Sequence, residues 1–209
     1  MKIKICGLNP TRDVKTCIDL NVHFLGFVFY DKSPRNTDLK EISVLKKYNS
    51  KTSHYVSVCV DPTDAFIQEN ILGNFEYIQL HGSETGERVK EINKMGIKVI
   101  KAIKVKEQKD IALYKDYENI ADLILFDSTS MEKSQSIPKD LLSGLPKGEK
   151  FGLAGAINLE NIQEYSQLGF NFLDLSSGLE RENLKGYKDH LKIKDFIKRV
   201  NKINENTSI

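Results

Sequence analysis

Residues 24–29 read Phe24-Leu25-Gly26-Phe27-Val28-Phe29, and a second run reads Leu123-Ile124-Leu125-Phe126. Both runs are too short and too rich in aromatic and branched residues for long helices, and we interpret them as strands. Successive side chains of a strand point to opposite faces, so both faces of these strands are apolar. Such strands need cover on both sides, as in a parallel sheet or a filled barrel enclosed by helices.

The same alternation continues outward from these runs to both ends of the chain. Short apolar runs predict strands at residues 3–6, 24–29, 55–60, 77–80, 98–102, 123–126, 151–154 and 172–175. Segments with helical spacing lie between them, at residues 11–20, 39–48, 63–72, 84–95, 107–117, 138–142, 159–168 and 192–204. Each predicted helix follows its strand, and no linker interrupts the pattern.

The number of units favours a barrel over an open sheet. Dividing 209 residues by eight gives about 26 residues per unit, close to a minimal strand-helix element. A doubly wound sheet would have about six strands and usually a Gly-rich turn after the first, yet residues 6–10 show no GxGxxG. We therefore predict an α/β fold, a single (β/α)8 barrel of eight parallel strands over residues 1–209, with the last few residues frayed.

Composition restricts the partners and the compartment. Thirty-one basic and 29 acidic residues leave a net charge of +2, too balanced for nucleic acid or a membrane surface as the main partner. No apolar run reaches the roughly 18 residues of a membrane span, and residues 1–5 read directly into a strand. Cys6, Cys17 and Cys59 fit neither a disulfide framework nor a metal pair, which predicts reduced thiols in a cytoplasmic protein.

Chemistry in a (β/α)8 barrel sits where the strands end at their carboxyl side. Small residues follow the last two predicted strands: Gly155, and then Ser176, Ser177 and Gly178. These exits are the usual phosphate cradle of the fold, because small residues let backbone N–H groups approach the oxygens. The alternative is that these residues only make tight turns.

Cys6 ends the first strand and Asp127 follows the sixth, so the two side chains can face each other across the mouth. A thiolate can act as a base, and a carboxyl group at an apolar rim can act as an acid. Two structural alternatives stay open. Cys6 can be a small buried apolar residue, and Asp127 can cap the turn at residues 128–129.

Three further charged residues lie near the predicted mouth. Lys4 shares the parity of Cys6, and Asp174 shares that of Ser176 on the neighbouring strand. Both charges would point into the barrel, which predicts a buried Lys4–Asp174 ion pair that is structural or biases the proton on Cys6. Arg35 is either a solvated charge or a planar ligand for a carboxylate.

The remaining patterns do not indicate a site. The four histidines show no metal-ligand spacing and HExxH is absent, so we predict no metal. The lysine-rich stretch at residues 101–106 lacks interleaved aromatic residues, and we interpret it as a solvated face.

The order and spacing of six short blocks resemble phosphoribosylanthranilate isomerase, from Lys4 to about Phe196. The blocks are Lys4-Ile5-Cys6-Gly7, residues 26–35, Gln79-Leu80-His81-Gly82, Leu125-Phe126-Asp127, Leu153-Ala154-Gly155, and Asp174 to Glu180 with Gly186-Tyr187-Lys188-Asp189 after it.

The resemblance implies a (β/α)8 enzyme of tryptophan biosynthesis that isomerises a small phosphorylated substrate without a cofactor, as a monomer or a homodimer. Asp127 would be the general acid and Cys6 the general base of an Amadori rearrangement. Arg35 would bind the anthranilate carboxylate. The other residues expected around the substrate are His81 and Asp174, with Gly155, Ser176, Ser177 and Gly178 at the phosphate.

The sequence departs from the family pattern at two places. Ala156 stands where the family usually has a second Gly, and a positive φ there would cost about 1 kcal/mol. Residues 130–138 contain no Gly where the family has a Gly-rich loop, and the chain has no Trp. Two other functions therefore stay open: a phosphosugar-binding barrel that is non-catalytic or altered in specificity, and a triose- or pentose-phosphate isomerase.

Overall fold

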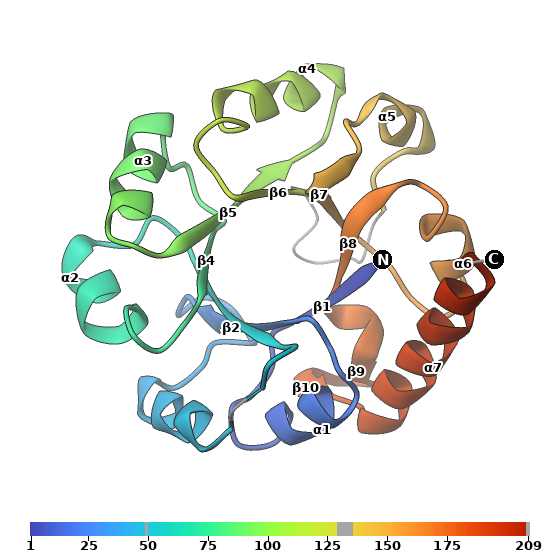
Figure 1. The fold of residues 1–209 in the computed structure, drawn as a ribbon, viewed down its shortest axis with the longest axis horizontal. Helices are drawn as coiled ribbons and strands as arrows, with labels where there is room; N and C mark the ends of the chain where they lie inside the picture. Colours follow the sequence, from blue (N-terminus) through green and yellow to red (C-terminus); the bar gives the residue numbers. More distant parts are fainter. Residues whose placement is uncertain (49, 129–135, 208–209) are drawn as a thin grey trace.

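The chain folds into one closed barrel with helices around it (Figure 1). The computed structural model describes residues 1–48, 50–128 and 136–207. Within these residues, eight parallel strands pair in sequence order, and the last pairs with the first to close the ring. The predicted (β/α)8 barrel is confirmed, and with it the expectation that the strand ends share one mouth.

All eight predicted strands occur, with bounds that differ from the predicted ones by no more than three residues. The strands are β1 (Lys2–Cys6), β2 (Phe24–Phe29), β3 (His54–Cys59), β4 (Tyr77–Leu80), β5 (Lys98–Lys104), β6 (Leu123–Asp127), β7 (Gly148–Ala154) and β8 (Phe170–Leu175).

The segments between the strands are helical, but most helices are shorter than predicted. They are α1 (Val14–Asp19), η1 (Leu39–Lys47), α2 (Asp64–Phe66), η2 (Ile67–Ile71), α3 (Gly86–Lys94), α4 (Gln108–Ile111), η3 (Ala112–Asp116), α5 (Lys139–Gly144), α6 (Ile162–Tyr165) and α7 (His190–Thr207). Side-chain caps set some of the starts: Thr63 accepts from the N–H of Phe66, and Thr85 accepts from that of Arg88.

Segment η1 is a 3-10 helix rather than the α-helix that its apolar spacing suggested. Its two buried residues, Ile42 and Leu45, are three positions apart. A 3-10 helix has three residues per turn, so this spacing places both on one face. In a short segment the same spacing also fits an α-helix, which is why the pattern alone does not separate the two.

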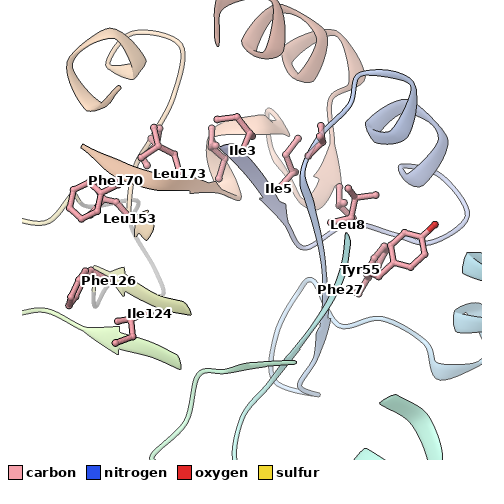
Figure 2. Packing of buried hydrophobic residues seen from close by; sticks show 14 of the residues in the cluster. Ile3, Ile5, Leu8, Phe27, Tyr55, Ile124, Phe126, Leu153, Phe170 and Leu173 are labelled. Carbon is pink, nitrogen blue, oxygen red and sulfur yellow. The ribbon is translucent and has the colours of Figure 1, made fainter. Parts of the chain in front are cut away.

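Two apolar clusters hold the barrel. The larger lies between the strands and the helices, and Figure 2 shows part of it, with Ile3 and Ile5 from β1 and Leu173 from β8. The smaller fills the barrel itself and includes Phe172 and Leu125. The alternation along each strand separates the two sets, because neighbouring side chains point to opposite faces.

The layer of side chains around Phe172 forms the floor of the barrel. Its close packing depends on the absence of a side chain at Gly152. Gly152 of β7 pairs with Phe172 of β8, and a methyl group on Gly152 would lie 2.2 Å from Cζ of the Phe172 ring. Phe172 has no exposed surface. The ring therefore occupies the space that a side chain on β7 would otherwise fill.

A hairpin that the sequence analysis did not predict follows β8. It comprises β9 (Glu180–Arg181) and β10 (Leu184–Lys188), which pair antiparallel after the short 3-10 helix η4 (Ser177–Leu179). Helix α7 then runs to Thr207, so the predicted frayed end concerns only residues 208–209, which lie outside the described residues. None of the described helices combines the length and the apolar character that crossing a bilayer requires.

We predict that Gly152→Ala lowers the free energy of unfolding by about 1–3 kcal/mol, because the added methyl group overpacks the barrel floor against Phe172. Denaturant unfolding followed by circular dichroism measures this change. Gly86→Ala is the matched control: its added methyl group would lie 3.4 Å from Ile120, an ordinary contact, and stability should be unchanged or slightly higher. Equal unfolding midpoints for Gly152→Ala and the wild type would contradict this account of the floor.

Candidate active site

The structure places every predicted site residue at the carboxyl side of the strands or just beyond it. Cys6 and Asp127 are the last residues of β1 and β6, and Asp174 is the last but one of β8. The others lie in the segments that follow β2, β4, β7 and β8: Arg35, His81, Gly155, Ser176, Ser177 and Gly178.

The predicted ion pair inside the barrel is present. The Nζ atom of Lys4 lies 2.7 Å from Oδ2 of Asp174, and the two side chains are 0% and 6% exposed. The residues are also paired in the register of β1 and β8. Burial alone would lower the pKa of Lys4, yet Asp174 and then Cys6 raise it above its ordinary value, so Lys4 stays charged.

Lys4 and Cys6 lie next to each other over a glycine. A methyl group on Gly26 of β2 would lie 3.2 Å from Nζ of Lys4 and 3.3 Å from Sγ of Cys6. Gly26 thus provides the space in which the two side chains meet. Burial raises the pKa of the Cys6 thiol, while the positive charge of Lys4 acts in the opposite direction.

Asp127 contacts a histidine from the loop that follows β4. The Oδ2 atom of Asp127 lies 3.3 Å from Nε2 of His81. The Nδ1 atom of His81 lies 3.4 Å from Nε2 in the side chain of Gln79. Burial raises the pKa of Asp174, and the carboxylate of Asp127 adds to this effect while Lys4 opposes it. The carboxyl group of Asp174 therefore interacts electrostatically with both Lys4 and Asp127.

A second buried ion pair supports the turn that carries His81. Lys101 lies 2.7 Å from Glu84 and donates to the carbonyl of Gly82 at 2.9 Å. Glu84 in turn accepts from the N–H of Gly82 at 3.1 Å. The prediction that residues 101–106 form a solvated face is wrong for Lys101, Ala102, Ile103 and Val105, which are buried, and holds only for residues 104 and 106. Lys101 lies on β5 and its partner Glu84 lies in the loop after β4, so the local pattern could not reveal the pair.

Arg35 packs against Gly7, the residue after Cys6, and is paired with a residue that the sequence analysis gave no role. A methyl group on Gly7 would lie 2.5 Å from Cδ of Arg35. The guanidinium donates from Nε to Oε1 of Glu180 at 2.6 Å and from Nη2 to Oε2 at 3.1 Å. Glu180 and Lys188 are the charged residues of this site that the sequence analysis missed, although both lie in the blocks quoted above.

The loops after β7 and β8 pack closely together. A methyl group on Gly178 would lie 2.5 Å from the carbonyl oxygen of Ile157. Gly155 has a φ of 110° and Ala156 a φ of 50°, so the positive φ considered from the sequence is present, with a strain of about 1 kcal/mol. The side-chain amide of Asn161 donates to the carbonyl of Ala156 at 2.9 Å and holds this conformation.

Two further expectations concern the loop after Asp127 and metal binding. Most of the Gly-free loop after Asp127, residues 129–135, lies outside the described residues, as does the cap considered at Thr129. Among the residues that are described, no three His, Cys, Asp or Glu side chains gather as a metal-binding group.

Comparisons with known proteins identify the family. A family model described as N-(5'phosphoribosyl)anthranilate (PRA) isomerase matches residues 3–199. The chain belongs to this family. The N-(5'-phosphoribosyl)anthranilate isomerase of Aquifex aeolicus is 35% identical over 212 residues, which cover 96% of this chain and 98% of that protein.

Solved structures of isomerases from this family have the same fold. The crystal structure of phosphoribosyl anthranilate isomerase from Thermotoga maritima matches with a TM-score of 0.83 at 27% identity, over 95% of this chain and 97% of that one. A second crystal structure of a phosphoribosyl anthranilate isomerase, in complex with reduced 1-(o-carboxyphenylamino)-1-deoxyribulose 5-phosphate, matches with a TM-score of 0.78 at 27% identity over the same shares of each chain. The chain is thus an enzyme, an isomerase of tryptophan biosynthesis.

We predict that Lys4→Met lowers the free energy of unfolding by about 3–5 kcal/mol, because it leaves Asp174 buried without its counter-charge. Combining Lys4→Met with Asp174→Leu should restore part of this loss, since the double variant buries no charge. Denaturant unfolding of the two single variants and the double variant gives the coupling between the residues. Strictly additive losses would show that the pair does not act as a unit.

Proposed function

We propose that this chain converts N-(5-phosphoribosyl)anthranilate into 1-(2-carboxyphenylamino)-1-deoxyribulose 5-phosphate by an Amadori rearrangement, with Asp127 as general acid and Cys6 as general base. The observation that carries the proposal is the arrangement of charges at the mouth. Cys6 lies beside Lys4, His81 lies beside Asp127, and Asp174 is within electrostatic reach of both sides.

The acid step opens the sugar ring. Asp127 gives its proton to the ring oxygen, the bond between this oxygen and C1′ breaks, and a protonated Schiff base forms at C1′. His81 lies 3.3 Å from Oδ2 and orients the carboxyl group for this transfer. This contact gives His81 a role at the acid, in place of the substrate-binding role suggested by resemblance alone.

The base step moves the proton from C2′. A Schiff base makes this proton acidic, so the thiolate of Cys6 can remove it to give an enolamine, which tautomerises to the ketone. Lys4 favours the thiolate, because a positive charge lies next to the sulfur. As the enolamine becomes the ketone, Cys6 gives its proton to C1′ and Asp127 takes the proton of the C2′ hydroxyl group, which restores both residues. The substrate gains protons at the ring oxygen and C1′ and loses them from C2′ and its hydroxyl group, so the isomerisation balances without a cofactor.

The remaining residues hold the two ends of the substrate. Arg35 packs against Gly7, the residue after Cys6, and binds the anthranilate carboxylate. Gly155 and the segment from Ser176 to Gly178 bind the phosphate through backbone N–H groups. Within the described residues, Oδ1 of Asp174 is buried without a hydrogen-bond partner, which suits it to accept from a sugar hydroxyl. The three free thiols fit an enzyme of the cytoplasm.

We expect purified protein to isomerise phosphoribosylanthranilate formed in the assay, and Cys6→Ser and Asp127→Asn each to lower kcat by about 10²–10⁴-fold, because each removes one proton-transfer group. Cys17→Ala on α1 and Asp116→Asn on the surface are matched controls that should keep their activity. Thermal unfolding should show that the two site variants stay folded. Binding of the reduced product analogue without turnover by the wild type would instead favour a non-catalytic phosphosugar-binding barrel.

We also predict that the rate at which iodoacetamide alkylates Cys6 rises with pH beyond about pH 8.5. The reactive form is the thiolate, and burial raises the pKa of Cys6 above its ordinary value. The fraction of thiolate in the free enzyme therefore still increases above the ordinary thiol pKa of about 8.5. Mass spectrometry of the peptide that contains Cys6 gives the rate at each pH, with circular dichroism as a check on folding. A plateau reached below about pH 7.5 would contradict the raised pKa of this buried thiol.

A further inference from the structure

The β9–β10 hairpin places two buried charges beside the mouth that none of the proposed chemical steps uses. Glu180 begins β9 and Lys188 ends β10, and they are 7% and 2% exposed. The hairpin directly follows the segment from Ser176 to Gly178, so its position is tied to the phosphate end of the site. The question is what two buried charges do at this position.

Glu180 accepts two hydrogen bonds from one edge of the Arg35 guanidinium. The Nε and Nη2 atoms of Arg35 donate to the two carboxylate oxygens of Glu180 at 2.6 Å and 3.1 Å. This is the planar, two-point geometry that fixes both the position and the plane of a guanidinium. In the described part of the chain, Nη1 makes no hydrogen bond, so the edge formed by Nη1 and the second N–H of Nη2 is left for another carboxylate.

Lys188 holds Glu180 in turn. Its Nζ atom lies 3.3 Å from Oε1 of Glu180 and donates to the carbonyl of Ser176 at 3.0 Å. Ser176 in turn donates to the carbonyl of Cys6 at 3.1 Å. The contacts therefore run from Arg35 through Glu180 and Lys188 to the start of the phosphate segment and to the last residue of β1.

Close packing leaves Arg35 little freedom. A methyl group on Gly186 of β10 would lie 2.4 Å from the carbonyl oxygen of Pro34, and one on Gly7 would lie 2.5 Å from Cδ of Arg35. The hairpin and the end of β1 thus confine Arg35 from two sides. An arginine side chain that is free to move would lose this rotamer freedom only when a ligand fixes it.

Arg35 and Lys188 share one carboxylate. Among the ion pairs of the described residues, both side chains contact Glu180, and burial lowers the pKa of Lys188, which weakens its claim on this carboxylate. A carboxylate on the substrate would give the guanidinium of Arg35 a second partner.

We propose that Glu180, supported by Lys188, is a positioning residue that makes the site selective for an aromatic amine that carries a carboxylate, by holding the free edge of Arg35 in one orientation. This inference rests on the proposed function. It adds a determinant of specificity that acts through Arg35 and does not itself touch the substrate.

The test compares the binding of two ligands, one that carries the carboxylate and one that lacks it. Dissociation constants are measured by calorimetry for reduced 1-(o-carboxyphenylamino)-1-deoxyribulose 5-phosphate and for the phenylamino analogue that lacks the carboxylate. For Glu180→Gln we expect the preference for the carboxylated ligand to fall at least about tenfold, the effect of losing one charged, two-point contact. Binding of the analogue should change by less than about threefold.

Two further variants make the result specific. Glu182→Gln, the same change at an exposed position of the same hairpin, should bind both ligands like the wild type. Glu180→Asp keeps the charge but shortens the side chain, so it should show an intermediate preference, and it serves in place of Glu180→Gln if that variant does not fold.

An equal loss of affinity for both ligands in Glu180→Gln would show a merely structural role and overturn the inference, as would an unchanged preference. The turnover of the wild type separates this result from the proposed function. If the wild type isomerises phosphoribosylanthranilate while Glu180→Gln keeps the full preference, only the inference about Glu180 fails. If the wild type has no such activity and no preference for the carboxylated ligand, both fail.

Discussion

The ion pair between Lys4 and Asp174 is the contact on which the rest of the site depends. Neither charge could remain alone inside a barrel filled with apolar side chains, because an unpaired buried ion is costly to desolvate. The pair also joins β1 to β8, the two strands that close the ring. It therefore fixes the closure of the barrel and, at the same time, places a positive charge beside Cys6.

The same principle recurs twice around the mouth. Lys101 and Glu84 form a buried pair that binds the backbone of the turn after β4, where His81 lies. Glu180 and Lys188 form another, which holds Arg35 and the carbonyl of Ser176. In each case a buried charged side chain forms hydrogen bonds with backbone groups of a loop that are not paired in a sheet or helix. These bonds hold the loop rigid. The strands supply the ring, and the buried pairs hold the loops that carry the chemistry.

Much of this fold could be predicted from the sequence because period and parity are local properties. The apolar run at residues 24–29 identified a strand with both faces covered, and the parity of Lys4 and Asp174 was enough to pair them once the barrel was assumed. The partner of Lys101 could not be predicted in this way, because Lys101 lies on β5, Glu84 lies in the loop after β4, and only the three-dimensional fold brings the two together. The β9–β10 hairpin was missed for a related reason. It is short and mostly polar, and Lys188 is buried through its contacts with Glu180 and with Ser176 after the end of β8.

The central claim is that one cavity is shared by the sulfur of Cys6 and the carboxyl group of Asp127. A crystal structure of this protein with the reduced product analogue bound tests it most directly. The account predicts Sγ of Cys6 within about 3.5 Å of C2′ and a carboxyl oxygen of Asp127 within about 3.2 Å of the former ring oxygen, on the same ligand molecule. A ligand that contacts one of the two groups and is separated from the other by protein atoms would contradict it.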